Sequence, residues 1–153
     1  MTDIGTQAPD FTLPDETGTE VTLSALTGGP VVLYFYPRDD TPGCTTEALD
    51  FTALLPEFQA AGATVFGISK DTVAKHGKFR EKRDLAVTLL SDAESDVCER
   101  YGVWVEKNMY GKKSMGIQRA TFLIDADGKI ARSWPKVKVA GHATEVLDAV
   151  RAL

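Results

Sequence analysis

Residues 31–48 read VVLYFYPRDDTPGCTTEA, and this stretch decides the fold. Its first part, 31–36, is a short run of β-branched and aromatic residues that ends at a proline. Such a run is typical of a strand that is buried on both faces. A helix is expected to begin near Pro42 or Gly43, because proline is favoured at the first helical position. The stretch therefore predicts a central strand, a tight turn and a helix that carries Cys44 in its first turn.

The rest of the chain continues this alternation of apolar runs and helical patterns. Further strands are expected at 21–23, 64–68, 87–90, 119–124 and 130–134. Helical turns are expected after caps at Ser24, Asp71 and Ser95, and a last helix is expected at 144–153. The Asp-Ala-Asp-Gly sequence at 125–128 predicts a hairpin turn. We therefore expect an α/β fold in which helices flank a mixed central sheet, with parallel strand pairs and one antiparallel hairpin.

Length and composition indicate one soluble domain that spans residues 1–153. The chain is 43% hydrophobic and 25% charged, and no apolar run approaches the length of a membrane helix. The first five residues carry no basic-then-apolar signal, so we expect a cytoplasmic protein. The net charge of −5 argues against nucleic acid or an anionic membrane as a main partner. Two cysteines are too few for a disulfide scaffold, so both are expected to be thiols at rest.

Cys44 is placed where a thiol can become reactive. A thiol reacts as the thiolate, and a helix N-terminus favours that anion through unpaired N–H groups and the positive end of the dipole. Thr41 brings a hydroxyl that can hydrogen-bond an oxygen near the sulfur, and Gly43 lets a small ligand approach the backbone. Pro37 ends the strand rigidly, and Pro42 has no N–H to leave unpaired. The residues alone leave two interpretations open: a reactive thiol, or an inert cysteine buried as a small apolar residue.

The sequence Pro-Arg-Asp-Asp-Thr-Pro-Gly-Cys at 37–44 resembles the peroxiredoxin signature, Pro-x-x-x-Thr-x-x-Cys. The longer stretch 36–47 is similar to one branch of that family, the bacterioferritin comigratory protein or peroxiredoxin Q group. The likeness extends over nearly the whole chain, through the segments 8–11, 67–69, 89–92, 101–104, 119–125 and 141–142. Because these matches occur in the same order, the resemblance is specific, and it favours the reactive thiol.

The resemblance implies a thioredoxin-like fold and an antioxidant thiol peroxidase. By position, Cys44 would be the nucleophile that forms a sulfenic acid, and Thr41 would hydrogen-bond the peroxide. Pro42 would shield the sulfenic acid, while Arg119 would stabilise the thiolate and position the peroxide. A guanidinium suits that role because it is a permanent cation with several donors. Glu47 is expected either to orient Arg119 or the helix turn, or to lie on a solvated face.

The sequence departs from many of these relatives five positions after Cys44, where they carry a second cysteine that resolves the sulfenic acid. Leu49 occupies that position, so this route is absent. Cys98 is the other thiol, and it is either packed in a short helix or has taken over resolution. We favour the first interpretation, in which an external thiol completes the cycle. A redox sensor without turnover is a further alternative, whereas a thiol–disulfide oxidoreductase is disfavoured because no Cys-x-x-Cys motif is present.

The same resemblance implies the partners of the reaction. Hydrogen peroxide and small organic hydroperoxides are the expected substrates, and thioredoxin or another thiol is the expected reductant. No metal is expected, because His76 and His142 show no ligand spacing with either cysteine, and no cofactor is expected, because the sulfur does the chemistry. We expect His76 to be solvated on a polar helix and His142 to cap or pack at the last helix. A basic turn is expected at 111–113, and the chain is expected to be a monomer.

Overall fold

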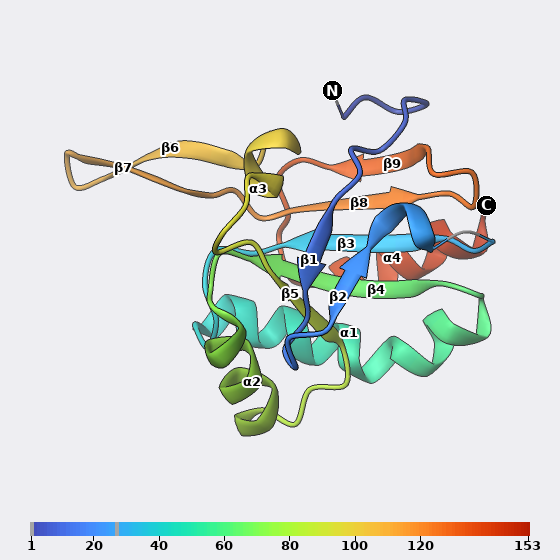
Figure 1. The fold of residues 1–153 in the computed structure, drawn as a ribbon, viewed down its shortest axis with the longest axis horizontal. Coiled ribbons are helices and arrows are strands. Elements are labelled where there is room, and N and C mark those ends of the chain that lie inside the picture. The colour runs from blue at the N-terminus through green and yellow to red at the C-terminus, as the bar shows by residue number, and fades with distance from the viewer. Residues whose placement is uncertain (1, 27) are drawn as a thin grey trace.

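The computed structural model describes residues 2–26 and 28–153, and its centre is a five-stranded mixed sheet (Figure 1). The strands are β3 (Val31–Phe35), β4 (Thr64–Ser69), β5 (Thr88–Ser91), β8 (Ala120–Ile124) and β9 (Ile130–Trp134). They lie in the order β5-β4-β3-β8-β9. The first three of these are mutually parallel, and β8 is antiparallel to both of its neighbours. The expected mixed sheet and the hairpin between β8 and β9 are confirmed.

Helices and two small hairpins surround this sheet. The helical elements are α1 (Pro42–Ala60), α2 (Val73–Lys82), α3 (Val97–Arg100), α4 (His142–Arg151) and the 3-10 turn η1 (Leu23–Ala25). The hairpins pair β1 (Thr12–Pro14) with β2 (Glu20–Thr22), and β6 (Trp104–Met109) with β7 (Lys112–Ile117). Figure 1 shows β1, β2 and η1 in front of the sheet and α4 behind it. None of the helices in the described part of the chain is both long and apolar enough to cross a membrane.

Each face of the sheet carries its own hydrophobic core. Side chains alternate along a strand, so Leu33 of β3 packs on one face while its neighbour Tyr34 packs on the other. Residues of β1, η1 and α3 complete the first core, and residues of α1, α2 and α4 complete the second. Cys98 belongs to the first core and Cys44 to the second. The sheet therefore separates the two thiols of the chain.

The pairing of β3 with β8 brings two distant segments together at the carboxyl end of β3. Phe35, the last residue of β3, lies opposite Ala120, the first residue of β8. The chain then leaves β3 through Tyr36 and turns into α1, while Arg119 immediately precedes β8. Open α/β sheets place their sites beyond the carboxyl ends of strands. The antiparallel register thus places Arg119 beside the turn that leads to Cys44.

The caps predicted for the first two helical turns are wrong. The hydroxyl of Thr72, and not the carboxylate of Asp71, caps α2 by accepting the N–H of Lys75 at 3.2 Å. The carboxylate of Asp71 is used elsewhere, in contacts that hold the turn after β3. Ser24 lies inside η1, whose cap position is Thr22. Thr22 and Thr72 both have the extended backbone that the cap position needs.

The start of α3 also differs from the prediction. The helix begins at Val97 with Asp96 at the cap position, so Ser95 lies outside it. A side chain from the end of β5 satisfies its first N–H groups: the carboxylate of Asp92 accepts the N–H of Val97 at 3.1 Å and that of Cys98 at 2.8 Å. This buried carboxylate replaces a local cap, because it supplies the acceptors from a different element.

The last helix begins at His142, two residues before the expected position. His142 is buried, and its Nε2 lies 2.8 Å from the hydroxyl oxygen of Thr121 on β8. Burial lowers the pKa of His142 to about 4, so the ring packs as a neutral imidazole at physiological pH. The prediction that His142 packs at the last helix is confirmed.

The β6–β7 hairpin was not predicted. A basic turn was expected at 111–113, but the turn residues are Tyr110 and Gly111, both with positive φ, of 53° and 79°. Lys112 and Lys113 are the first residues of β7. Two successive residues with positive φ are what a tight hairpin turn requires. The hairpin projects from the body of the molecule (Figure 1).

Candidate active site

Cys44 lies in the first turn of α1, as predicted. Thr41 is the residue before the helix, with the extended backbone (φ −90°, ψ 156°) that a following proline favours. The first helical hydrogen bond runs from the N–H of Thr45 to the carbonyl of Thr41, at 2.8 Å. The N–H groups of Gly43 and Cys44 precede that bond and have no acceptor within the helix. Cys44 is only 1% exposed, so its side chain is buried in this first turn of the helix.

Arg119 joins Cys44 to Glu47 through the two ends of its guanidinium. Its Nη2 donates to the sulfur of Cys44 at 3.4 Å, and its Nη1 donates to Oε1 of Glu47 at 2.8 Å. The Glu47 side chain is 2% exposed and the Arg119 side chain 16% exposed. The forked geometry of arginine permits both contacts at once, which an ammonium group does not. Of the two positions considered for Glu47, the structure has the buried one, in contact with Arg119.

The charges of this site influence one another. Burial raises the pKa of Glu47 to about 7, although the Arg119 guanidinium acts in the opposite direction. Burial would lower the pKa of Arg119, but Glu47 and then Cys44 outweigh it and raise that pKa. The second carboxylate oxygen of Glu47, Oε2, is buried without a hydrogen-bond partner among the described residues. Arg119 therefore remains a cation beside the sulfur, while the carboxyl group of Glu47 titrates near neutral pH.

Gly43 leaves the space that the guanidinium occupies. A Cβ added at this position would lie 3.2 Å from Nη2 of Arg119, which is closer than ordinary van der Waals contact. A larger side chain would therefore push Arg119 away from Cys44. The glycine expected for close approach of a ligand also permits close approach of the arginine.

Thr41 and the two prolines flank the start of α1. The hydroxyl of Thr41 donates to the carbonyl of Arg38 at 3.1 Å, which leaves the oxygen lone pairs free to accept a hydrogen bond. Pro42 occupies the first position of α1 and is exposed, above the buried Cys44. Pro37 follows the last buried residue of the strand run and begins the turn. These residues therefore belong to the turn between β3 and α1 that precedes Cys44.

A buried hydrogen-bond network fixes the turn between β3 and α1. The carboxylate of Asp39 accepts the Tyr36 hydroxyl at 2.5 Å and lies 2.6 Å from Nδ1 of His76. The N–H of Asp39 donates to Oδ2 of Asp71 at 2.8 Å. The other ring nitrogen of His76, Nε2, lies 2.9 Å from the carbonyl of Leu90. The prediction that His76 is solvated is wrong: it is fully buried, because its two acceptors come from the turn and from β5.

The spacing of α2 carries a signal for this burial. His76 and Phe79 are three residues apart, on the same face of the helix, and both are buried. Asp39, Asp71 and His76 also bring three potential metal-ligand atoms within 4.8 Å of one another. Both ring nitrogens of His76 already face protein acceptors, which favours a structural role for the cluster. We interpret it as the support of the turn that carries Thr41.

A second set of contacts ties the same turn to the end of α2. Asp40 has a positive φ of 60°, unusual for a residue other than glycine. Its carboxylate accepts from Nζ of Lys82 at 2.7 Å and from Nη2 of Arg83 at 2.8 Å. These pairs are partly exposed, so each contributes little stability alone. The turn is thus attached to α2 and its end at two successive residues, Asp39 through His76 and Asp40 through Lys82 and Arg83.

Cys98 and Leu49 occupy positions that do not support resolution within the chain. Cys98 is fully buried in the core on the other side of the sheet from Cys44. Burial, and then the carboxylate of Asp92, raises the pKa of the Cys98 thiol well above its ordinary range. Leu49 is 42% exposed on the surface of α1. A protonated thiol across the sheet is a poor nucleophile toward an oxidised Cys44.

The geometry suits a reaction at sulfur. A buried sulfur at the start of a helix receives a guanidinium N–H, which is an environment that favours an anion. Such a sulfur is suited to react as a nucleophile toward a small electrophile. The same donors would then lie near the charge that develops on the leaving group.

Comparison with known proteins gives a consistent result. The sequence model of the AhpC/TSA family matches residues 4–133. The chain is 53% identical over 145 residues to a putative peroxiredoxin Bcp of Coxiella burnetii, covering 95% of this chain and 96% of that protein. It is 46% identical over 149 residues to peroxiredoxin Bcp of Bacillus subtilis, covering 97% and 95% of the two chains.

Solved structures show the same similarity in three dimensions. The bacterioferritin comigratory protein of Xanthomonas campestris, studied for its alkyl peroxide reduction activity, superposes with a TM-score of 0.91 at 48% identity, over 98% of each chain. Peroxidoxin BcpB of Mycobacterium tuberculosis superposes with a TM-score of 0.87 at 41% identity, over 100% of this chain and 99% of that one. The likeness thus covers the whole length and includes the turn that carries Cys44.

Proposed function

Because the chain belongs to the AhpC/TSA family and is a peroxiredoxin of the Bcp, or peroxiredoxin Q, group, we propose that it reduces peroxides through Cys44 alone. The observation that carries this proposal is the contact of Arg119 with the sulfur of Cys44 at 3.4 Å. A permanent cation at that distance favours the thiolate, which is the reactive form of cysteine.

In the first half-reaction the thiolate of Cys44 attacks one peroxide oxygen. An S–O bond forms, the O–O bond breaks, and the other oxygen leaves as water or an alcohol after taking a proton. The product on the protein is a sulfenic acid. Thr41 accepts a hydrogen bond from the peroxide, while Arg119 and the free N–H of Cys44 stabilise the developing negative charge. Pro37 and Pro42 shape the rim and shield the product.

In the second half-reaction an external thiol regenerates Cys44. Attack on the sulfenic sulfur releases water and gives a mixed disulfide, which a second thiol reduces. Leu49 at the usual resolving position and Cys98 beyond the sheet both support this single-cysteine route. Thioredoxin or another thiol is the proposed reductant, and we propose that the chain acts as a monomer in the cytoplasm. Hydrogen peroxide and small organic hydroperoxides are the proposed substrates, and the activity of the Xanthomonas relative supports the latter.

The test combines peroxide consumption with intact mass. Cys44→Ser should abolish peroxide consumption with a thiol donor, whereas Cys98→Ser should retain it. Reduced protein treated with one equivalent of hydrogen peroxide should gain one oxygen, or a sulfenic-acid trap, on Cys44. Loss of two hydrogens with a peptide linking Cys44 to Cys98 would overturn the single-cysteine route. Slow, stoichiometric oxidation without turnover would instead indicate a redox sensor.

A further inference from the structure

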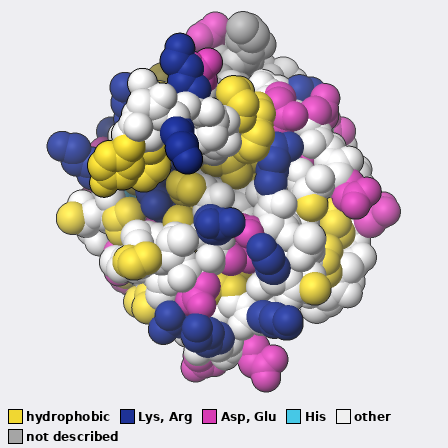
Figure 2. Space-filling view, turned by 90° about the vertical axis from the view of Figure 1, so that its left-hand side faces the viewer, with side chains coloured by type: hydrophobic (Ala, Val, Ile, Leu, Met, Phe, Trp, Pro, Cys, Tyr) yellow, Lys and Arg dark blue, Asp and Glu magenta, His cyan; other side chains and the backbone are white. Residues whose placement is uncertain are grey.

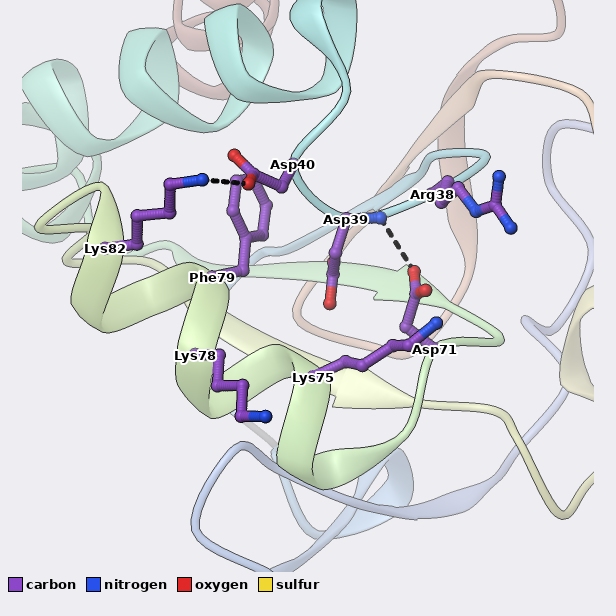
Figure 3. Close-up of a pocket in the computed structure, with 8 residues that line it drawn as sticks. All are labelled: Arg38, Asp39, Asp40, Asp71, Lys75, Lys78, Phe79 and Lys82. Carbon is purple, nitrogen blue, oxygen red and sulfur yellow. Dashed lines mark hydrogen bonds and ion pairs between the residues drawn. The ribbon is translucent and has the colours of Figure 1, made fainter.

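A groove of about 340 Å³ lies between α2 and the turn that leads into α1 (Figure 3). One wall is formed by the turn residues Arg38, Asp39 and Asp40, and the other by side chains of α2. Figure 3 shows the chain running from Asp40 directly into the first turn of α1, where Cys44 lies. The volume falls in the range of sites that hold small molecules.

The acidic residues of this groove already have partners. Asp39 and Asp71 belong to the buried network that fixes the turn, and their carboxylates accept hydrogen bonds from it. The carboxylate of Asp40 is paired with two cations at the end of α2. The carboxylates of the groove are therefore engaged by partners within the protein, and the four cations that line the groove outnumber its three carboxylates.

Three cations of the groove are left without an acidic partner. Arg38, Lys75 and Lys78 line it, are exposed, and form no ion pair with any described residue. Lys75 and Lys78 are three residues apart on α2, and Lys82 continues the same side of the helix. Like charges at this spacing repel, so the arrangement costs stability that a bound anion would offset. Figure 2 views the side of the molecule that carries this turn and shows Lys and Arg side chains spread over that face.

We propose that this groove binds the carboxylate of a small anionic thiol, and that this thiol is the reductant of oxidised Cys44. The inference rests on the proposed function, which requires an external thiol in every cycle. The carboxylate of such a thiol can form ion pairs with the unpaired cations of the groove. Hydrogen peroxide is uncharged and forms no ion pair with them. In a chain of net charge −5, a local excess of cations beside the catalytic turn would raise the concentration of such a thiol near the sulfur.

The step is an ordinary thiol exchange. The bound thiolate attacks the sulfenic sulfur of Cys44, an S–S bond forms, and the S–O bond breaks so that hydroxide leaves and takes a proton to become water. A second anionic thiol attacks the mixed disulfide. Cys44 returns to the thiol, and the two reductant molecules leave as their disulfide.

Two small thiols that differ in charge test the proposal. Wild-type protein and the variant K75Q/K78Q are oxidised with one equivalent of hydrogen peroxide, and intact mass confirms the sulfenic acid. The rates of reduction by 3-mercaptopropionate, which is anionic, and 2-mercaptoethanol, which is neutral, are then measured. The ratio of the two rates cancels any general change in the reactivity of Cys44. The variant K112Q/K113Q, on β7 and outside the lining of the groove, loses the same charge and serves as the matched control.

We expect K75Q/K78Q to lower the ratio at least about threefold, K112Q/K113Q to leave it unchanged, and added salt to lower it in the wild type. An equal ratio in all three proteins would overturn the proposal. Reduction by thioredoxin but by neither small thiol would also overturn it. Failure of hydrogen peroxide to oxidise Cys44 would instead refute the proposed function, and the mass measurement detects that before any thiol is added.

Discussion

Nη2 of Arg119 lies 3.4 Å from the sulfur of Cys44, although 75 positions separate the two residues in the chain. The contact depends on the antiparallel pairing of β3 with β8, which sets Ala120 opposite Phe35. The same guanidinium holds Glu47 at 2.8 Å, and Gly43 leaves room for it. The site is thus assembled from one helix turn and one strand start, and the sheet register determines its geometry.

Arg119→Lys should slow the reaction with peroxide about 100-fold, the cost of losing one donor aimed at developing charge. Lysine keeps the positive charge but has a single nitrogen, so it cannot reproduce the contacts that two guanidinium nitrogens make with Cys44 and Glu47. The rate of hydrogen peroxide consumption in a single turnover measures this directly. Arg132→Lys, an exposed arginine paired with Glu145, is the control and should leave the rate unchanged. Equal rates of peroxide consumption in the two variants would show that a positive charge at position 119 is sufficient for the reaction, without the two-nitrogen geometry of arginine.

Glu47→Gln should change how stability depends on pH. Because burial raises the pKa of Glu47 from 4.5 to about 7, folding favours its protonated form. Its contribution to stability is therefore complete below pH 4.5 and is lost as the pH rises through about 7. The free energy of unfolding of the wild type, relative to Glu47→Gln, should fall across this interval by an amount on the order of 3 kcal/mol.

Urea unfolding at several pH values between these limits measures the effect of Glu47. Glu57→Gln replaces an exposed carboxylate of the same helix and should show no comparable trend. The prediction would be contradicted if the free energy of unfolding of the wild type, relative to Glu47→Gln, rose with pH. Such a rise would mean that the attraction of Arg119 for the Glu47 carboxylate exceeds the effect of burial.

His76→Leu should destabilise the fold by about 3 kcal/mol or more, because it leaves the Asp39 carboxylate buried without its main partner. Peroxide reduction should also slow, since Asp39 holds the turn that carries Thr41. Chemical denaturation and single-turnover kinetics give the two readouts. Glu81→Gln, an exposed change on the same helix, should alter stability by less than about 0.5 kcal/mol. A stable His76→Leu variant would show that the network does not support the turn.

Cys98→Ala should leave peroxide turnover with an external thiol unchanged. Cys98 lies in the core opposite to that of Cys44, so its removal should cost only packing, about 1 kcal/mol of stability. Steady-state turnover and the mass of the oxidised protein check this expectation. A large loss of turnover, with wild-type oxidation of Cys44, would mean that Cys98 takes part in regeneration after all.

Local features of the site follow directly from the sequence. Proline at the start of a helix, an extended residue before it and a buried strand ahead of it are rules of short range, and they place Thr41, Pro42 and Cys44 correctly. The sequence pattern also predicts the order of the main strands and helices. The role of Arg119 was implied by the family resemblance, because no local rule specifies which distant residue a strand register will bring to the sulfur.

The burial of His76 is only partly signalled by the sequence, because its spacing from Phe79 places it on the buried face of α2 but does not identify its partners. Its helix is largely polar, and the partners of its ring nitrogens are Asp39 and the carbonyl of Leu90, from two other elements. A buried polar residue is tolerated only when distant partners satisfy it, and local patterns do not encode them. The β6–β7 hairpin was missed for the opposite reason. Its residues are mostly exposed and polar, so they show little of the alternation that marks a strand.

The position of the two cysteines on opposite faces of the sheet has a consequence for survival under oxidative stress. Under the proposed single-cysteine route, no second thiol of the chain protects the sulfenic acid of Cys44 as a disulfide, so the oxidised sulfur persists until thiols in its surroundings reduce it. When those thiols are scarce, the sulfenic acid persists and meets a second peroxide, which carries it to the irreversible sulfinic acid. The time for which the enzyme stays active would then depend on the ratio of thiol to peroxide around it, and a low ratio would lead to irreversible inactivation.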